Sequence, residues 1–254
     1  MGPLRVALLG DFRASAGDEL LVAGGAKQRA VLAMLALGAG QVVPESRLID
    51  GIWGDETPNA VRGSLQVYVA HWRRVLAQAK CDERIERHGS GYLLTMDPHG
   101  LDVRRVMALA EHGRLALAEE RFGVAVQRFD EALAFWRGDT LHDFTAMPFH
   151  LWEAMAIDTA RTDLHADRMD ALLGTGAGGE LVADLEALVM RHPYEERFRG
   201  QLMHALYRAG RQVDAVRACT AARDALAEIG LEVGPSLRRM EERVLQQDPD
   251  LDTP

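Results

Sequence analysis

Two short runs contain residue types of ligand or metal chemistry, but neither has the pattern that this chemistry requires. The glycine-rich run 174–179 resembles a phosphate loop, yet it lacks the Gly-Lys-Ser/Thr ending and a preceding strand. Asp163, His165 and Asp167 are metal-ligand types, but on a helix His165 points away from both aspartates, which favours a solvated face. The nine histidines show no zinc-type spacing, and neither of the two cysteines has a base nearby in sequence. We therefore expect no enzyme: no catalytic residue, no metal site and no cofactor.

Residues suited to nucleic-acid contact gather in the segment 57–76. Thr57 is a good N-cap, and Pro58 suits the first turn of a helix. Apolar residues then recur every three or four positions and predict one buried stripe: Val61, Leu65, Tyr68, Val69, Trp72 and Leu76. The opposite side carries the candidate contacts Arg62, Ser64, Gln66, Val67, His71, Arg73 and Arg74. Taken alone, this pattern is also typical of a solvated amphipathic helix.

The neighbouring segments favour DNA binding over a merely solvated face. A short helix from Pro44 to about Trp53 precedes the long one, and the runs 84–88 and 92–96 flank Gly89-Ser90-Gly91, which predicts a hairpin. This order would let the long helix enter a major groove, where Val67 suits contact with a thymine methyl group. The hairpin adds candidate contacts to the neighbouring backbone or minor groove: Arg87, His88, Ser90 and Tyr92.

The elements before this pair complete a winged helix. The runs 4–9 and 20–22 predict strands, and a 3.6-residue period predicts a helix from about Ala26 to Gly38. Strands, three helices and a hairpin are the order of a winged helix-turn-helix. We expect residues 1–96 to form this domain and to close its core without help, because the sequence Asp-Pro-His-Gly at 97–100 breaks the pattern.

Beyond that break the sequence predicts helices throughout. They are expected near 101–120, 122–137, 148–173, 180–191, 195–209, 211–229 and 235–247. Small and aromatic residues within 118–133 and 206–219 resemble tetratricopeptide units, in which paired helices approach closely. The predicted fold is mainly α: an α+β winged helix, an all-α tetratricopeptide-like domain over 98–247, and a flexible tail over 248–254.

Charge is distributed unevenly between these halves. The net charge is −9, but residues 1–95 hold eleven Lys/Arg and ten Asp/Glu, so the acidity belongs to the second half. DNA affinity must then come from clustered arginines rather than from overall charge. No run of eighteen apolar residues could span a membrane, and we expect a cytoplasmic protein with no membrane partner.

Ten segments, found in order over nearly the whole chain, carry a family resemblance. They are 24–30, 47–54, 65–69, 73–76, 89–92, 132–138, 191–197, 201–203, 206–212 and 234–238. With them the sequence resembles the small form of the Streptomyces antibiotic regulatory protein (SARP) family. The resemblance implies an OmpR-type winged helix and a bacterial transcriptional activation domain. It also implies an activator of secondary-metabolite (antibiotic) genes. Side-by-side copies would bind direct repeats in double-stranded promoter DNA and recruit RNA polymerase holoenzyme through its sigma factor.

Two departures from the family pattern keep other functions open. Gly63 stands where the family usually has a polar residue, and Ala70-His71-Trp72 stands where it usually has Ser-Arg-Leu. His71 thus replaces an arginine commonly aimed at DNA. One alternative is a protein-interaction adapter whose winged helix binds DNA weakly. Another is a regulator whose helical domain senses a small molecule.

Overall fold

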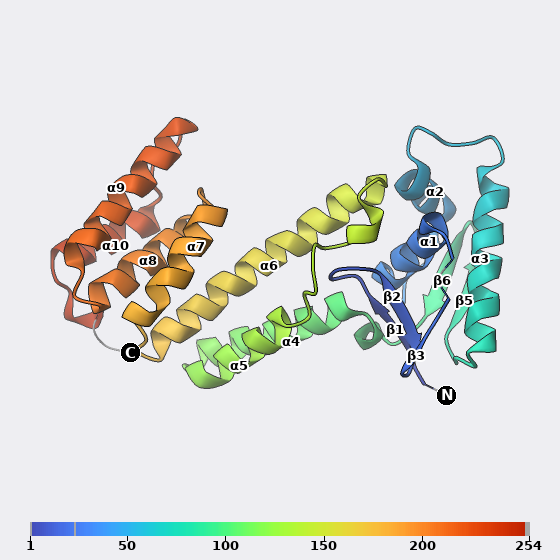
Figure 1. Ribbon diagram of the computed structural model, residues 1–254, viewed down its shortest axis with the longest axis horizontal. Helices are drawn as coiled ribbons and strands as arrows, with labels where there is room; N and C mark the ends of the chain where they lie inside the picture. Colours follow the sequence, from blue (N-terminus) through green and yellow to red (C-terminus); the bar gives the residue numbers. More distant parts are fainter. Residues whose placement is uncertain (1, 23, 252–254) are drawn as a thin grey trace. The chain divides into compact units, whose positions relative to one another are not determined.

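The computed structural model describes residues 2–22 and 24–251 of the chain. It is mainly helical with two small sheets in the N-terminal part, which confirms the predicted fold class (Figure 1). The residues form two compact units: unit 1, residues 1–110 with 131–162, and unit 2, residues 111–130 with 163–254. Neither unit is continuous in sequence.

Unit 1 contains both sheets, and each sheet is three-stranded and antiparallel. The strands are β1 (Leu4–Ala7), β2 (Arg13–Ala16), β3 (Glu19–Leu20), β4 (Val43–Pro44), β5 (Arg84–His88) and β6 (Gly91–Thr95). Their order is β1-β2-β3 in one sheet and β4-β6-β5 in the other. Strands β2 and β4 were not predicted from the sequence. The inward residues of β2 are alanines, which are weak strand formers, and β4 is too short to show a period.

Three helices complete the winged helix: α1 (Ala26–Leu37), α2 (Glu45–Trp53) and α3 (Val61–Gln78). Every residue of α1 from Ala30 to Ala36 is buried, as expected for a helix that is apolar on all sides. Helix α2 packs closely on it, because a Cβ atom at Gly51 would lie 2.5 Å from Cε of Met34. Helix α3 packs against α1 and β5, so its inner side is held by the core (Figure 1).

A segment beyond residue 97 pairs with the end of β1. The backbone N–H groups of Leu8 and Leu9 donate to the carboxylate of Asp102 at 2.9–3.0 Å, and both leucines are fully buried. Their carbonyl groups accept hydrogen bonds of 2.9 Å from the N–H groups of Leu141 and Arg137. The end of β1 therefore obtains its partners from residues more than ninety positions away.

Aromatic side chains also connect the N-terminal residues to the segment beyond residue 97. The Phe12 ring meets Trp72 and Phe144 edge-on, with ring centroids 6.4 and 5.7 Å apart. The Phe12 N–H group donates to Asp143 Oδ2 at 2.6 Å. Although residues 1–96 are predicted to close a core alone, the structure shares that core with later residues, and the predicted boundary lies inside unit 1. Sequence periodicity identifies each element but not the partner that buries it.

All seven helices predicted in the second half are present. They are α4 (Asp102–Ala118), α5 (Phe122–Leu133), α6 (Pro148–Gly174), α7 (Val182–Arg191), α8 (Glu196–Arg208), α9 (Gln212–Glu228) and α10 (Pro235–Leu245). Short 3-10 turns occur between or after them: η1 (Pro98–Gly100), η2 (His142–Phe144), η3 (Gly179–Leu181) and η4 (Pro249–Leu251). Proline at the first turn of α10, after an extended Gly234, explains why its start was predicted correctly.

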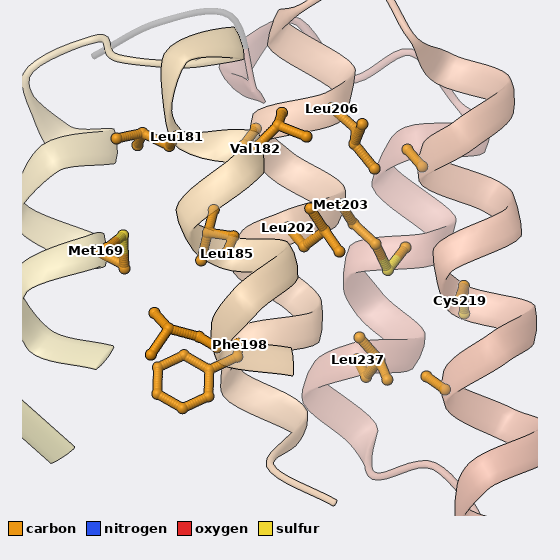
Figure 2. Packing of buried hydrophobic residues seen from close by; sticks show 14 of the residues in the cluster. Met169, Leu181, Val182, Leu185, Phe198, Leu202, Met203, Leu206, Cys219 and Leu237 are labelled. Atoms are coloured by element: carbon orange, nitrogen blue, oxygen red, sulfur yellow. The ribbon is translucent and has the colours of Figure 1, made fainter. Parts of the chain in front are cut away.

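The core of unit 2 joins the C-terminal half of α6 to η3 and helices α7 to α10. Figure 2 shows Leu185 of α7 near Phe198 and Leu202 of α8, with Met203 turned toward α9. The α9 positions that pack on α8 are small and fully buried, among them Ala215 and Cys219. Small side chains let the two helices approach closely, as in tetratricopeptide pairs.

The tail predicted to be flexible is held as far as Leu251. That residue is fully buried in the core of unit 2. Its carbonyl oxygen lies 2.9 Å from Nε2 of His204 and accepts from Nε of Arg208 at 2.7 Å. Polar composition alone did not reveal this anchor. Residues 252–254 lie outside the described part of the chain.

Candidate DNA interface

Helix α3 begins later than the sequence suggested. Its first residue is Val61 and its N-cap is Ala60, whereas Thr57 and Pro58 were predicted as N-cap and first turn. The hydroxyl group of Thr57 instead donates to the carbonyl oxygen of Gly54 at 2.6 Å. Thr57 thus satisfies the end of α2 and is not available to cap α3.

The apolar stripe of α3 is confirmed. Val61, Leu65, Val69, Trp72 and Leu76 are all buried, and Tyr68 is half-buried. Trp72 is fully buried, and its indole N–H group donates to the carbonyl oxygen of Gln28 at 2.6 Å. Tyr68 stacks on Trp53 of α2 with ring centroids 6.0 Å apart and planes 2° apart. These contacts fix the rotation of α3 about its own axis, and with it the side that faces outward.

The outward side of α3 presents free cations and a large apolar side chain, that of Val67. Arg62, Gln66 and Arg74 are exposed, and among the described residues no partner is found for either guanidinium group. Val67 lies between them and is 62% exposed. The two arginines are twelve residues apart, which is about 18 Å along a helix. An apolar side chain flanked by unpaired arginines is suited to a groove with phosphates on both sides.

Three other predicted contacts on α3 are either half-buried or already hydrogen-bonded within the domain. Ser64 and His71 are half-buried. The His71 ring packs edge-on against Trp72, and its Nε2 atom is buried without a hydrogen-bond partner. Arg73 is exposed, but its Nε donates to the carbonyl oxygen of Ile85 in β5 at 2.7 Å. We therefore assign Arg73 to holding the hairpin against α3, and we place His71 at the edge of the outward side.

The hairpin β5–β6 presents a small exposed tip. Gly89 has φ +54°, the conformation that favours glycine, and Ser90 beside it is exposed. His88 is exposed too, and its Nε2 lies 3.1 Å from Oε2 of Glu86. The tip is tied to the start of α2, since the Ser90 carbonyl oxygen accepts a 2.9 Å hydrogen bond from the Glu45 N–H group.

Arg87 is held on three sides. Its Nη1 donates to Glu45 Oε1 at 2.7 Å and to the Tyr92 hydroxyl at 2.9 Å, and its Nε donates to the Gly89 carbonyl oxygen at 3.0 Å. Its guanidinium carbon lies 5.0 Å from the centroid of the Tyr92 ring. Tyr92 itself is 2% exposed. The sequence predicted Tyr92 as a DNA contact, but burial leaves it the role of supporting Arg87.

Sequence reasoning missed Glu45 in this arrangement. It identified a helix start at Pro44 but gave the following acidic residue no role. An acidic residue at the first position of α2 is favourable to the helix dipole by itself, so nothing in the local pattern pointed to the hairpin. A β4–β6 pairing would have revealed the link, but β4 has only two residues.

The structure shows the surroundings of the runs that were set aside on sequence grounds. Asp167 was expected on a solvated face, but it is 6% exposed and accepts from Arg114 at 2.6 Å and from Arg197 at 2.7 Å. The glycine-rich run 174–179 follows the helix α6 rather than a strand. Within residues 2–22 and 24–251, no His, Cys, Asp and Glu side chains cluster as a metal site. Nor does the described part contain a helix long and apolar enough to cross a bilayer.

A winged helix-turn-helix with an outward arginine face, followed by paired helices, defines a class of two-part transcriptional regulators. Residues 18–94 match the family model "Transcriptional regulatory protein, C terminal", and residues 101–245 match "Bacterial transcriptional activator domain". The second match covers more than half of the chain. The order of the two matches is the order inferred from the sequence.

Comparison with named relatives identifies the family within this class of regulators. The regulatory protein DnrI of Streptomyces peucetius is 34% identical over 234 residues, which cover 89% of this chain and 86% of DnrI. EmbR of Mycobacterium tuberculosis is 34% identical over 245 residues, 95% of this chain but 63% of EmbR. A solved structure of EmbR with a low-affinity phosphopeptide superposes with TM-score 0.93 at 32% identity, covering 98% of this chain and 66% of that one. The chain belongs to the Streptomyces antibiotic regulatory protein family of transcriptional regulators.

Proposed function

We propose that the chain is a sequence-specific transcription activator that binds direct repeats in double-stranded promoter DNA. The observation that carries this proposal is the outward side of α3, where Arg62, Gln66, Val67 and Arg74 stand exposed above a buried stripe. Helix α3 would read the major groove, and the hairpin tip with Arg87, His88 and Ser90 would contact the adjacent backbone or minor groove. The relatives DnrI and RedD, both from streptomycetes, are named as regulators, which supports a role in regulation.

The second half would connect bound DNA to transcription. In this proposal, side-by-side copies occupy the repeats, and the helical domain recruits RNA polymerase holoenzyme through its sigma factor. The target would be a secondary-metabolite gene cluster, and the protein would work in the cytoplasm at the nucleoid. The acidity of the second half supports this division of labour, because an acidic surface discourages nonspecific contact with DNA.

The DNA-binding part of the proposal is tested by titrating the full chain with a promoter fragment at several salt concentrations. Affinity should fall steeply with salt, because arginine–phosphate contacts release counterions. Arg62→Gln and Arg74→Gln should each reduce the slope of log K against log salt by about 1. Arg104→Gln, which removes an exposed arginine of α4, is the matched control and should leave the slope unchanged. A slope that is flat, or equally affected by all three variants, would contradict the assigned face.

The activation part is tested by transcription in vitro with purified RNA polymerase holoenzyme. Transcript yield should rise when the full chain is added to a template with two repeats. Inserting half a helical turn between the repeats should abolish the increase while leaving binding to each repeat intact, because side-by-side copies would then face opposite sides of the duplex. Equal transcription from both templates would contradict the recruitment of polymerase by adjacent copies.

A further inference from the structure

The carboxylate of Glu45, the first residue of α2, forms an ion pair with Arg87 of the hairpin. Its side chain is 14% exposed, whereas that of Arg87 is 43% exposed. The same oxygen, Oε1, accepts from Arg87 at 2.7 Å and lies 3.3 Å from the Tyr92 hydroxyl. A largely shielded carboxylate is therefore joined to a partly exposed guanidinium group at the tip of the hairpin.

These contacts use two of the three nitrogen atoms of the guanidinium group. Nε is taken by the Gly89 carbonyl oxygen and Nη1 by Glu45 and Tyr92. The remaining nitrogen, Nη2, has no partner among the described residues. The planar guanidinium group is thus fixed through two of its nitrogens and stacked on the Tyr92 ring, and the third is left free.

We infer that Glu45 is a positioning residue for DNA recognition: it holds Arg87 so that Nη2 is presented to a phosphate oxygen. This inference rests on the proposed DNA-binding function and assigns a role to a residue outside the helix and hairpin contacts. A free arginine loses side-chain conformational freedom when it binds, and an arginine already fixed in the unbound protein does not. Charge-assisted hydrogen bonds in which one guanidinium group bridges two anions suit this arrangement.

The opposite role would be competition, in which Glu45 withdraws Arg87 from DNA. The two roles predict opposite signs for the same variant. Removing an acidic residue from a DNA-binding domain ordinarily tightens binding, since repulsion from phosphates is lost. If Glu45 positions Arg87, its neutralisation must weaken binding in spite of that gain. The burial of the Glu45 carboxylate favours the positioning role, because a shielded charge that is already paired repels DNA little.

The test compares Glu45→Gln with Asp50→Asn in the full chain, using fluorescence anisotropy with a labelled promoter fragment. Both variants remove one negative charge from α2, and Asp50 is exposed. We expect Glu45→Gln to weaken binding about two- to tenfold, the equivalent of ordering one arginine side chain. We expect Asp50→Asn to bind as tightly as the unchanged protein, or more tightly. Unchanged or tighter binding by Glu45→Gln would overturn the inference.

A double-variant cycle separates positioning from a general loss of structure. Arg87→Met should weaken binding and lower the salt slope by about 1, and Glu45→Gln should add no further weakening in that background. Weakening by Glu45→Gln that persists without Arg87 would overturn the inference, whether it came from misfolding or from another contact. Melting temperatures of all variants identify misfolding directly. Failure of the unchanged protein to bind any promoter fragment would instead refute the proposed function, and the positioning role with it.

Discussion

Replacing Asp102 with alanine should destabilise unit 1 severely, although Asp102 lies beyond the winged helix in sequence. Its carboxylate accepts from the N–H groups of Leu8, Leu9 and Val103 at 2.9–3.0 Å, and it is 7% exposed. Leu8 and Leu9 are fully buried, so water does not reach their N–H groups. Without the carboxylate these two N–H groups lose their hydrogen-bond acceptor. An unsatisfied buried N–H group costs about 1–3 kcal/mol, which gives about 2–6 kcal/mol for the two.

One opposing effect reduces this loss. Burial raises the pKa of the Asp102 carboxyl group above its ordinary value, although the hydrogen bonds from Leu9, Leu8 and Val103 lower it. Holding that group ionised therefore costs free energy at neutral pH, and alanine removes this cost. We expect a net loss of about 2–4 kcal/mol at pH 7, a large part of the stability of an ordinary domain.

Tryptophan fluorescence during urea unfolding measures the free energy of unfolding of unit 1, since all four tryptophans lie in that unit. Asp97→Ala is the matched control, because the exposed Asp97 side chain accepts only from the His99 N–H group at 2.9 Å. A group whose folded-state pKa is raised contributes more stability at low pH and loses it as the pH rises through that pKa. The loss caused by Asp102→Ala should therefore be larger near pH 4 than at pH 8. A loss below about 0.5 kcal/mol at both pH values would refute the assigned role, since an ordinary surface substitution has an effect of that size.

Four further outcomes are expected. A fragment of residues 1–162 should unfold cooperatively, whereas a fragment of residues 1–96 should lack a cooperative transition by circular dichroism; a stable shorter fragment would contradict the shared core. Trp72→Ala should lower the free energy of unfolding by about 3–5 kcal/mol, and His71→Ala by about 1 kcal/mol or less, because only Trp72 is fully buried; equal losses in urea unfolding would contradict this. Val67→Ser should reduce preference for one thymine about tenfold in a DNA selection without changing the melting temperature, while Val213→Ser, 65% exposed on α9, changes neither; a change in melting would place Val67 in the core. At pH 8 Cys219 should resist iodoacetamide, because burial raises its pKa to about 11, and it should react only in urea; rapid labelling of the folded protein would refute its burial.

The sequence was most informative where a regular period continued over several turns. The stripe from Val61 to Leu76 is buried as predicted, because a helix core face repeats every 3.6 residues whatever it packs against. The seven later helices were identified for the same reason. The start of α3 was less certain, since Thr57 can serve either the helix that follows or the one that precedes it, and the hydrogen bond to Gly54 chose the latter.

Pairings across long distances were not predictable in this way. Nothing near Asp102 indicates that its carboxylate meets Leu8, and nothing near Glu45 indicates Arg87. Tyr92 was placed on the interface because it adjoins the hairpin tip, yet it is buried, and both its hydroxyl group and its ring contact Arg87. Side chains that orient the contacts of a site depend on tertiary structure, and a single sequence does not encode them as a local pattern.

The contacts of Asp102, Arg137 and Leu141 with the end of β1 have a consequence for synthesis of the protein. The winged helix emerges first from the ribosome, but Leu8 and Leu9 receive these hydrogen-bond partners, and Phe12 part of its packing, only with residues 102 and 137–144. At 5–20 residues per second, the stretch from 96 to 144 takes roughly 2–10 s to translate. During that interval the nascent N-terminal segment exposes apolar surface and has no completed core. The core around the end of β1 is therefore completed only after residue 144 has been synthesised, so a translation product that stops before residue 137 lacks part of the core beneath the winged helix.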